Sequence, residues 1–221
     1  MKIGTDGVLL GAWTSIKNNP DSILDIGTGT GIIALQLAQR SNALTIDAIE
    51  IDDNAYEQAV ENFENSKWGD RLFCYHASLD GFTNEIDDKY DLIIANPPFY
   101  SDQFETQNIA RNKARFTSSL SFNSLIISAS KLLTNNGIFS VIIPYKEEQN
   151  FITIAAENKL FPIRICRVKG NPSSEIKRSL LEFSFEKNNP ITTNLIIEIN
   201  RHEYTENYTD LVKDFYLKMD S

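Results

Sequence analysis

The sequence contains few of the residues that form disulfides or hold metals. Its 221 residues include two cysteines, Cys74 and Cys166, and two histidines, His76 and His202. The cysteines lie far apart in separate apolar runs, and no Cys-x-x-Cys or Cys/His group accompanies them. These spacings exclude a disulfide framework and the usual zinc motifs. We therefore expect two reduced, buried thiols, no bound metal and no catalytic role for either histidine.

Long apolar runs are also absent. No stretch of about 18 apolar residues could span a bilayer, and the N-terminus lacks the basic, apolar and small-residue order of a secretion signal. The sequence therefore predicts a soluble, cytoplasmic protein.

The sequence lacks an overall excess of positive charge, because its formal net charge is -9. The acidic residues are concentrated in the first half. Residues 1–100 carry 6 Lys or Arg against 16 Asp or Glu, whereas residues 159–187 carry 7 against 3. A polyanion binds through basic residues, so we expect any such partner to contact the second half of the chain.

Apolar, strand-like runs alternate with amphipathic helical stretches along the chain, which is typical of an α/β fold. The expected strands are 22–27, 44–51, 71–77, 90–96, 138–144, 161–170, 178–187 and 194–200. The expected helices are 4–16, 30–41, 53–68, 121–137, 147–159 and 205–218, with Asp53 as a cap of the third and Gly137 as the stop of the fourth. The pattern predicts seven mostly parallel strands with helices on both faces, an antiparallel C-terminal hairpin and an additional edge strand. We expect a single domain, 1–221, with 188–221 supplying the edge strand and a closing helix.

Three glycines, Gly27, Gly29 and Gly31, follow the first expected strand and open a helix, where backbone can approach a flat ligand closely. A dinucleotide loop would have a further glycine at the position of Ile32, and a nucleoside triphosphate loop would end in Gly-Lys-Ser/Thr, so neither motif is present. Asp25 precedes the loop, and a carboxylate repels phosphate. The loop therefore favours a cationic, phosphate-free nucleoside, although ordinary turn geometry is the alternative.

Two further motifs stand at the ends of expected strands. Glu50 ends the second strand, where a carboxylate can accept hydrogen bonds from both hydroxyls of a ribose. Asn96, Pro97, Pro98 and Phe99 follow the strand 90–96. An Asn-Pro-Pro sequence can be a simple turn, but its amide and carbonyl oxygens could also accept hydrogen bonds from an amine.

These residues carry a resemblance. Asp25-x-Gly27-x-Gly29-x-Gly31 followed by Glu50 resembles the S-adenosylmethionine loop of Rossmann-like class I methyltransferases, and Asn96-Pro97-Pro98-Phe99 resembles their amino-methylating motif. Over nearly its whole length the chain resembles more closely the bacterial family that methylates N6 of adenine 37 in a valine tRNA. The segment 2–13, "KIGTDGVLLGAW", and the tail "YTENYTDLVKDFYLK" narrow the resemblance to that family.

The resemblance implies S-adenosylmethionine as cofactor and tRNA as partner, with no membrane and no obligate protein partner. Residues 1–18 would form a helix that closes over the cofactor. The implied cofactor-binding residues are Lys2, Thr5, Asp6, Asp25, Gly27, Thr28, Gly29, Gly31, Glu50, Ile51, Ser78, Leu79 and Asn96. Asp6 would accept from the cofactor's ammonium group, although Thr5 or Asp6 could instead cap the helix. Ser78 and Leu79 stand where many relatives have an acidic residue near the cofactor's adenine.

The implied catalytic residues are Asn96, Pro97, Pro98 and Phe99. Candidate RNA-binding residues are Arg111, Lys113, Arg115, Arg167, Lys169, Lys177 and Arg178, which could equally be solubilising surface charges. Methylation of a DNA adenine or of a protein glutamine, whose amide is also planar, remains open on the motifs alone. A non-catalytic nucleotide-binding protein of the same fold also remains open.

Overall fold

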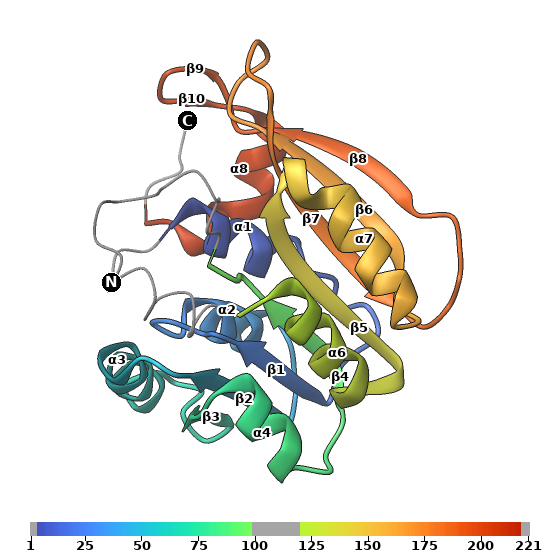
Figure 1. The fold of residues 1–221 in the computed structure, drawn as a ribbon. Helices are drawn as coiled ribbons and strands as arrows, with labels where there is room; N and C mark the ends of the chain where they lie inside the picture. The colour runs from blue at the N-terminus through green and yellow to red at the C-terminus, as the bar shows by residue number, and fades with distance from the viewer. Residues whose placement is uncertain (1–3, 99–119, 218–221) are drawn as a thin grey trace, which may run out of the picture.

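The computed structural model describes residues 4–98 and 120–217, and the chain is drawn in Figure 1. Five residues predicted for the site lie outside the described residues: Lys2, Phe99, Arg111, Lys113 and Arg115.

Eight strands form one large sheet in the order β3-β2-β1-β4-β5-β7-β6-β8. They are β1 (Ser22–Ile26), β2 (Thr45–Glu50), β3 (Leu72–His76), β4 (Tyr90–Ala95), β5 (Leu133–Pro144), β6 (Phe161–Lys169), β7 (Ile176–Ser184) and β8 (Ile191–Ile196). Strand β7 is antiparallel to β5 and β6, and the other pairings are parallel. Two short strands, β9 (Glu198–Asn200) and β10 (Glu203–Tyr204), form a separate pair. The predicted mostly parallel sheet with its hairpin and edge strand is confirmed.

Helices cover both faces of the sheet. They are α1 (Thr5–Trp13), α2 (Ile32–Arg40), α3 (Asp53–Glu64), α4 (Leu79–Glu85), α6 (Phe122–Leu132), α7 (Glu148–Glu157) and α8 (Glu206–Val212), with short 3-10 turns at Tyr145–Glu147 (η1) and Lys213–Phe215 (η2). Buried side chains of α1, α2, α3 and α8 share one core cluster with the sheet. Those of α4, α6 and α7, which lie across one face in Figure 1, share the other.

The central strands have apolar side chains on both faces, because each face of the sheet packs against a layer of helices. Ile23 belongs to the cluster under α1 and α2, whereas its neighbour Leu24 belongs to the cluster under α4 and α6, and both are fully buried. Phe151 of α7 packs on Phe139 of β5 and Phe183 of β7, with ring centroids 6.3 and 5.7 Å away. Aromatic burial thus fixes α7 to the sheet.

Two predicted boundaries are wrong. Helix α6 ends at Leu132, and Gly137 lies within β5 instead of ending the helix. A β-carbon on Gly137 would lie 2.7 Å from Leu133 Cγ and 2.9 Å from the carbonyl oxygen of Tyr90, so the glycine is required by close packing. The edge strand β8 begins at Ile191 and ends at Ile196, earlier than the predicted 194–200.

The helix starts also differ from the prediction. The cap of α3 is Asp52, whose carboxylate accepts a hydrogen bond from Ala55 N at 2.9 Å, and not Asp53. Helix α4 was not predicted, because only seven polar and apolar residues without clear periodicity form it, and Ser78 caps it by accepting from Gly81 N. Helix α1 begins at Thr5, and its N-cap residue is Gly4 without a side-chain hydrogen bond, so neither Thr5 nor Asp6 caps the helix.

Both cysteines are free thiols. Cys166 is buried as expected, whereas Cys74 is only half-buried. Burial raises the pKa of both thiols, which keeps them protonated. No helix among the described residues is long and apolar enough to cross a membrane.

An ion pair in the C-terminal hairpin, between the buried Glu182 and the partly exposed Arg164, also binds the residues at the end of α1. The Glu182 carboxylate of β7 is completely buried, and it accepts hydrogen bonds from Ser15 N at 2.7 Å and from Arg164 Nη1 of β6 at 2.8 Å. The Arg164 guanidinium also lies over the Trp13 ring, 4.3 Å from its centroid. Burial raises the pKa of Glu182, and Arg164 opposes this shift.

We expect Glu182→Ala to lower the free energy of unfolding by about 3 kcal/mol, because the change leaves Arg164 without its carboxylate and the Ser15 N–H without an acceptor. Urea denaturation would measure this loss. The exposed Glu157→Ala should change stability by less than about 0.5 kcal/mol. Equal stability of the two variants would contradict a structural role for the ion pair.

Candidate active site at the carboxyl edge of the sheet

Strand register brings the predicted motifs together at one edge of the sheet. Ile26, the last residue of β1, pairs with Ala95 of β4 on one side and with Ile49 of β2 on the other. The glycine loop, Asn96 and Glu50 follow these residues directly. All three therefore emerge side by side at the carboxyl edge, where ligands of open α/β sheets bind.

The glycine loop depends on backbone angles that other residues rarely adopt. Gly27, Gly29 and Gly31 have φ of 68°, 60° and 80°, which is the left-handed region. A β-carbon on Gly31 would lie 2.4 Å from Phe63 Cε1, so this glycine packs against α3. A β-carbon on Gly27 would meet no atom within 4 Å, so the loop is open there. Gly31 is thus needed for close packing against α3, whereas Gly27 lies beside open space.

Asp25 contacts the glycine loop through a hydrogen bond with Thr28. Its side chain is fully buried, and Oδ2 accepts a hydrogen bond from Thr28 Oγ1 at 2.6 Å. Oδ1 is buried without a hydrogen-bond partner among the described residues. Burial raises the pKa of Asp25 to about 7, although the Thr28 hydrogen bond opposes the shift. The carboxyl group therefore acts on the loop through Thr28.

Glu50 is held by three backbone amides. Its Oε2 accepts from Gly29 N at 2.8 Å, and its Oε1 accepts from Ile51 N at 2.8 Å and Asp52 N at 2.9 Å. Hydrogen bonds from N–H groups orient a carboxylate strongly. A fixed acceptor therefore faces the glycine loop, as a site for ribose hydroxyls requires.

Asn96 lies at the carboxyl edge of the sheet and not in the core. It is partly exposed, Pro97 is buried and Pro98 is exposed. A β-carbon on Gly7 of α1 would lie 3.9 Å from Asn96 Nδ2 and 3.6 Å from Ile32 Cγ2. The first turn of α1 therefore packs on Asn96 and on the residue that follows the glycine loop. The sequence analysis did not predict this contact of Gly7.

Asp6, in the same turn of α1, forms an ion pair that the sequence did not predict. Its Oδ2 accepts from Arg178 Nε of β7 at 2.8 Å, and both side chains are about one-third exposed. The ion pair joins a residue predicted to bind cofactor to a residue predicted to bind RNA. Thr5 is exposed at the start of the helix.

The residues predicted near the cofactor's adenine differ in exposure. Ile51 follows Glu50 and is 55% exposed, so its side chain is available to a ligand. Ser78 caps α4, and the Leu79 side chain is buried in the core beside α4 and α6. The Leu79 side chain therefore has no free surface for a ligand. His76 lies close by, with Nε2 3.1 Å from Asp53 Oδ1.

The basic residues around the β6–β7 turn fall into two kinds. Arg167 donates two hydrogen bonds to Glu148 Oε1, at 2.7 and 3.2 Å, and one to Oε2, and Arg178 pairs with Asp6. Lys169 and Lys177 form no ion pair within the parts of the chain that the structure describes. Both lysines lie at the carboxyl edge, because β6 ends and β7 begins there.

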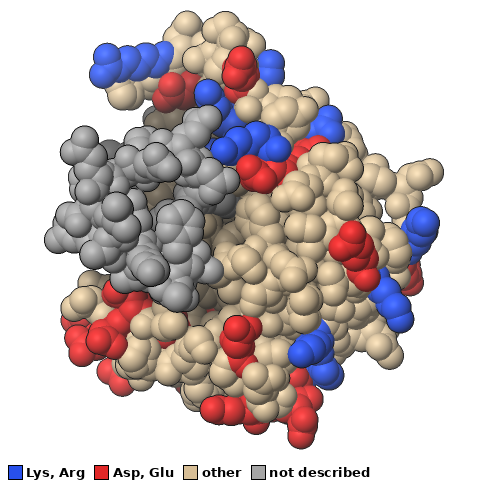
Figure 2. Space-filling model, viewed as in Figure 1, with Lys and Arg blue, Asp and Glu red and all other residues tan. Residues whose placement is uncertain are grey.

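Charge is unevenly distributed on this face of the molecule. Figure 2 shows several Lys and Arg side chains, with some acidic ones among them, in the upper part of the view, over the region of β6 and β7, while the lower left and bottom, over α3 and α4, are mainly acidic. A polyanion would therefore approach from the side of the hairpin.

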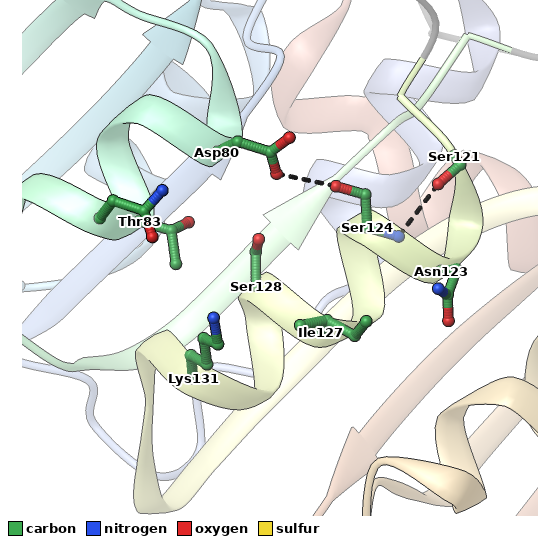
Figure 3. A pocket seen from close by; sticks show the side chains of 9 residues that line it. Asp80, Thr83, Ser121, Asn123, Ser124, Ile127, Ser128 and Lys131 are labelled. Atoms are coloured by element: carbon green, nitrogen blue, oxygen red, sulfur yellow. Dashed lines mark hydrogen bonds between the residues drawn. The ribbon is translucent and has the colours of Figure 1, made fainter.

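A cavity of about 400 Å³ between α4 and α6 is separate from this cleft. Figure 3 shows polar side chains from both helices pointing into it, with Ser124 Oγ donating to Asp80 Oδ1 at 2.9 Å. None of the residues predicted for the site lines this cavity. Among residues 4–98 and 120–217, no three His, Cys, Asp or Glu side chains are grouped so that they could hold a metal ion.

Comparison with known proteins agrees with this geometry. Residues 8–155 match the methyltransferase small domain family. The chain is 61% identical over 219 residues to a tRNA1(Val) (adenine(37)-N6)-methyltransferase of Flavobacterium psychrophilum, covering 99% of this chain and 94% of that protein. It is 59% identical over 221 residues to the protein of the same name from Christiangramia forsetii, covering 99% and 92%.

The chain belongs to the tRNA1(Val) (adenine(37)-N6)-methyltransferase family. Its fold agrees with that of a predicted O-methyltransferase from Agrobacterium tumefaciens, whose crystal structure matches with a TM-score of 0.71 at 18% identity and covers 95% of this chain and 96% of that one. The predicted enzyme class, the Rossmann-like class I fold and S-adenosylmethionine as cofactor are thus confirmed.

The residues at the edge suit a methyltransferase cofactor. Gly27 lies beside free space, and the fixed carboxylate of Glu50 faces the loop. The Glu50 carboxylate beside the loop disfavours a phosphate-bearing ligand and favours a cation. S-adenosylmethionine has a positive charge and no phosphate, so the donor set fits it.

We expect the stability of Asp25→Asn to depend on pH differently from the stability of the wild type. The folded-state pKa of Asp25, about 7, is above its usual 3.8, so the folded protein binds more protons than the unfolded chain between these values. Wild-type stability should therefore fall as pH rises through this window, whereas the variant lacks this loss. The free energy of unfolding of Asp25→Asn, relative to that of the wild type, should therefore increase by on the order of 2 kcal/mol from pH 5 to pH 8.

Urea denaturation of the cofactor-free protein at several pH values would measure this difference. Asp80→Asn, in α4, is a control carboxylate in the same assay. An advantage of Asp25→Asn that stays constant across the pH range would contradict the raised pKa.

Proposed function

We propose that this chain transfers the methyl group of S-adenosylmethionine to the exocyclic N6 amine of adenine 37 in the anticodon loop of tRNA1(Val). Relatives that carry this name are 59–61% identical to the chain over nearly its whole length. The observation that carries the proposal is the position of Asn96, partly exposed at the end of β4 and beside the end of β1. An amine-accepting group is thereby adjacent to the glycine loop.

Residues around the loop would hold the cofactor. Glu50 would accept from the ribose hydroxyls, and Gly27 and Gly29 would allow close approach of the nucleoside. Ile51 and the backbone at Ser78 and Leu79 would border the adenine. Thr5 and Asp6 of α1 would lie at the amino acid end, together with Lys2. When bound, the cofactor supplies an electrophilic methyl group on a positively charged sulfur.

Asn96 and Pro97 would activate the acceptor amine. The lone pair of an adenine amine is delocalised into the ring, which makes the amine a weak nucleophile. If Asn96 Oδ1 and the Pro97 carbonyl oxygen each accept one amine hydrogen, the nitrogen becomes more tetrahedral and its lone pair is directed toward the methyl group. The same oxygens stabilise the positive charge that develops on nitrogen.

The two prolines would keep these acceptors in place. The ring of Pro98 restricts the backbone of Pro97 and so orients its carbonyl group before the substrate arrives. Phe99 would stack on the flipped base, a contact worth about 1–3 kcal/mol in single-strand binding proteins. No metal and no strong base are needed, because the donor is already activated and the product amine loses its proton to water.

The tRNA would bind across the basic edge beside the site. Lys169 and Lys177 supply positive charge from β6 and β7, and Arg111, Lys113 and Arg115 would add to it from the segment after Phe99. Arg167 is held by Glu148, so it would contribute its charge from a fixed position. Contacts of this kind position the RNA backbone and do not read its sequence.

The remaining properties follow from this function. The chain would act as a single methyltransferase domain, 1–221, with 1–18 covering the cofactor and 188–221 completing the sheet edge. It would work in the cytoplasm, where tRNA is modified, and no obligate protein partner is required for the chemistry.

We expect Asn96→Ala to bind S-adenosylmethionine normally and to methylate tRNA at least about a hundredfold more slowly, as when another transition-state hydrogen bond is removed. Transfer of labelled methyl to unmodified tRNA, followed by nucleoside analysis, measures this. Asn123→Ala, an exposed asparagine of α6 in the cavity of Figure 3, is the matched control. Unchanged turnover of Asn96→Ala would refute its role.

The same assay with DNA and protein pools separates the alternatives. Label in N6-methyladenosine of tRNA supports the proposal. Label in DNA adenine or in protein glutamine would assign another substrate, and no transfer to any pool would indicate a protein that only binds nucleotides.

We expect Lys177→Gln and Lys169→Gln each to weaken tRNA binding severalfold and to reduce the slope of log affinity against log salt by about 1, because each removes one phosphate contact. Binding titrations at several salt concentrations would measure both effects. Lys17→Gln, at an exposed site before β1 and therefore at the opposite edge of the sheet, is the control. An unchanged affinity and slope would exclude this surface.

A further inference from the structure

The ion pair between Asp6 and Arg178 lies between the cofactor half of the cleft and the basic edge. Arg178 is the third residue of β7 and pairs with Pro144, the last residue of β5. Its Nε donates to Asp6 Oδ2 at 2.8 Å, and its Nη1 donates to the carbonyl oxygen of Lys177 at 3.1 Å. The first hydrogen bond joins the guanidinium to α1, and the second holds it against its own strand.

Asp6 occupies a turn that already touches the cleft. The next residue, Gly7, lies beside Asn96 and Ile32, because a β-carbon on Gly7 would be within 4 Å of both side chains. The Asp6 side chain is about one-third exposed. A carboxylate whose direction is already fixed loses less conformational entropy when it binds a cationic ligand than a freely rotating one does.

We propose that Arg178 is a positioning residue of the cofactor site, and that it acts by orienting the Asp6 carboxylate toward the cofactor's ammonium group. This inference rests on the proposed function and changes the part assigned to Arg178, which the sequence grouped with the RNA-binding residues. Oδ2 of Asp6 is used by Arg178, and the carboxylate has a second oxygen for the ligand. Arg178 suits this role because its planar guanidinium fixes direction better than a lysine ammonium does.

A comparison of cofactor affinity with melting temperature distinguishes a positioning role of Arg178 from a role in stabilising the fold. A partly exposed ion pair contributes little to folding, so loss of Arg178 should lower the melting temperature by no more than about 4 °C. Cofactor affinity should change much more, because a hydrogen bond to a charged ligand group depends on the orientation of Asp6.

The test measures S-adenosylmethionine binding by calorimetry in the absence of RNA. We expect Asp6→Asn to bind the cofactor about tenfold more weakly and Arg178→Gln about fivefold more weakly. The double variant should bind no worse than Asp6→Asn alone, since Arg178 acts through Asp6. Additive losses, or unchanged or tighter binding in Arg178→Gln, would overturn the inference.

A second experiment measures how the tRNA affinity of the Arg178 variant depends on salt concentration. Arg178→Gln should leave the slope unchanged, in contrast to the neighbouring Lys177→Gln. A slope reduced as much as in Lys177→Gln, with normal cofactor affinity, would assign Arg178 to the RNA edge. The calorimetric arm needs no RNA, so it tests Arg178 even if the wild-type protein proves not to methylate tRNA.

Discussion

The site depends on the parallel pairing of β1 with β4. Because Ile26 lies opposite Ala95, the glycine loop and Asn96 leave the sheet next to each other, so in the proposed reaction no side chain would have to reach far to bring cofactor and acceptor amine together. A slip of one residue would turn every buried side chain of the strand to the opposite helical layer. The burial of Ile23 and Leu24 in different clusters thus fixes the register of β1 against β4, and this register places the glycine loop beside Asn96.

Charge is sorted along the same edge. Carboxyl groups lie where a cationic cofactor would bind, with Glu50 held by backbone amides and Asp25 buried beneath the loop. Lysines lie beyond β5, on the hairpin strands, where a polyanion would approach. The two ligands carry opposite charges, so this separation limits repulsion between the acidic residues and the RNA. An acidic protein can therefore serve a nucleic acid substrate.

Much of the fold and of the cofactor loop was predictable, because those signals are local. Three glycines after an apolar strand specify a left-handed loop, and the alternation of strands and helices specifies the sheet. Gly137 was misjudged because a glycine is compatible both with a helix end and with close packing against Leu133, and one sequence does not distinguish them. The pairing of Asp6 with Arg178 joins residues far apart in the chain, so no sequence spacing indicates it.

The contacts of α1 have a consequence for synthesis. This helix is translated before β5 and β7, yet the residues just after it bind Ser140 and Glu182, and its first turn binds Arg178. The nascent chain lacks these partners until β5 and β7 have been translated. Helix α1 can therefore complete the cleft only after the C-terminal hairpin has folded, so an unfinished chain has the glycine loop without a finished site.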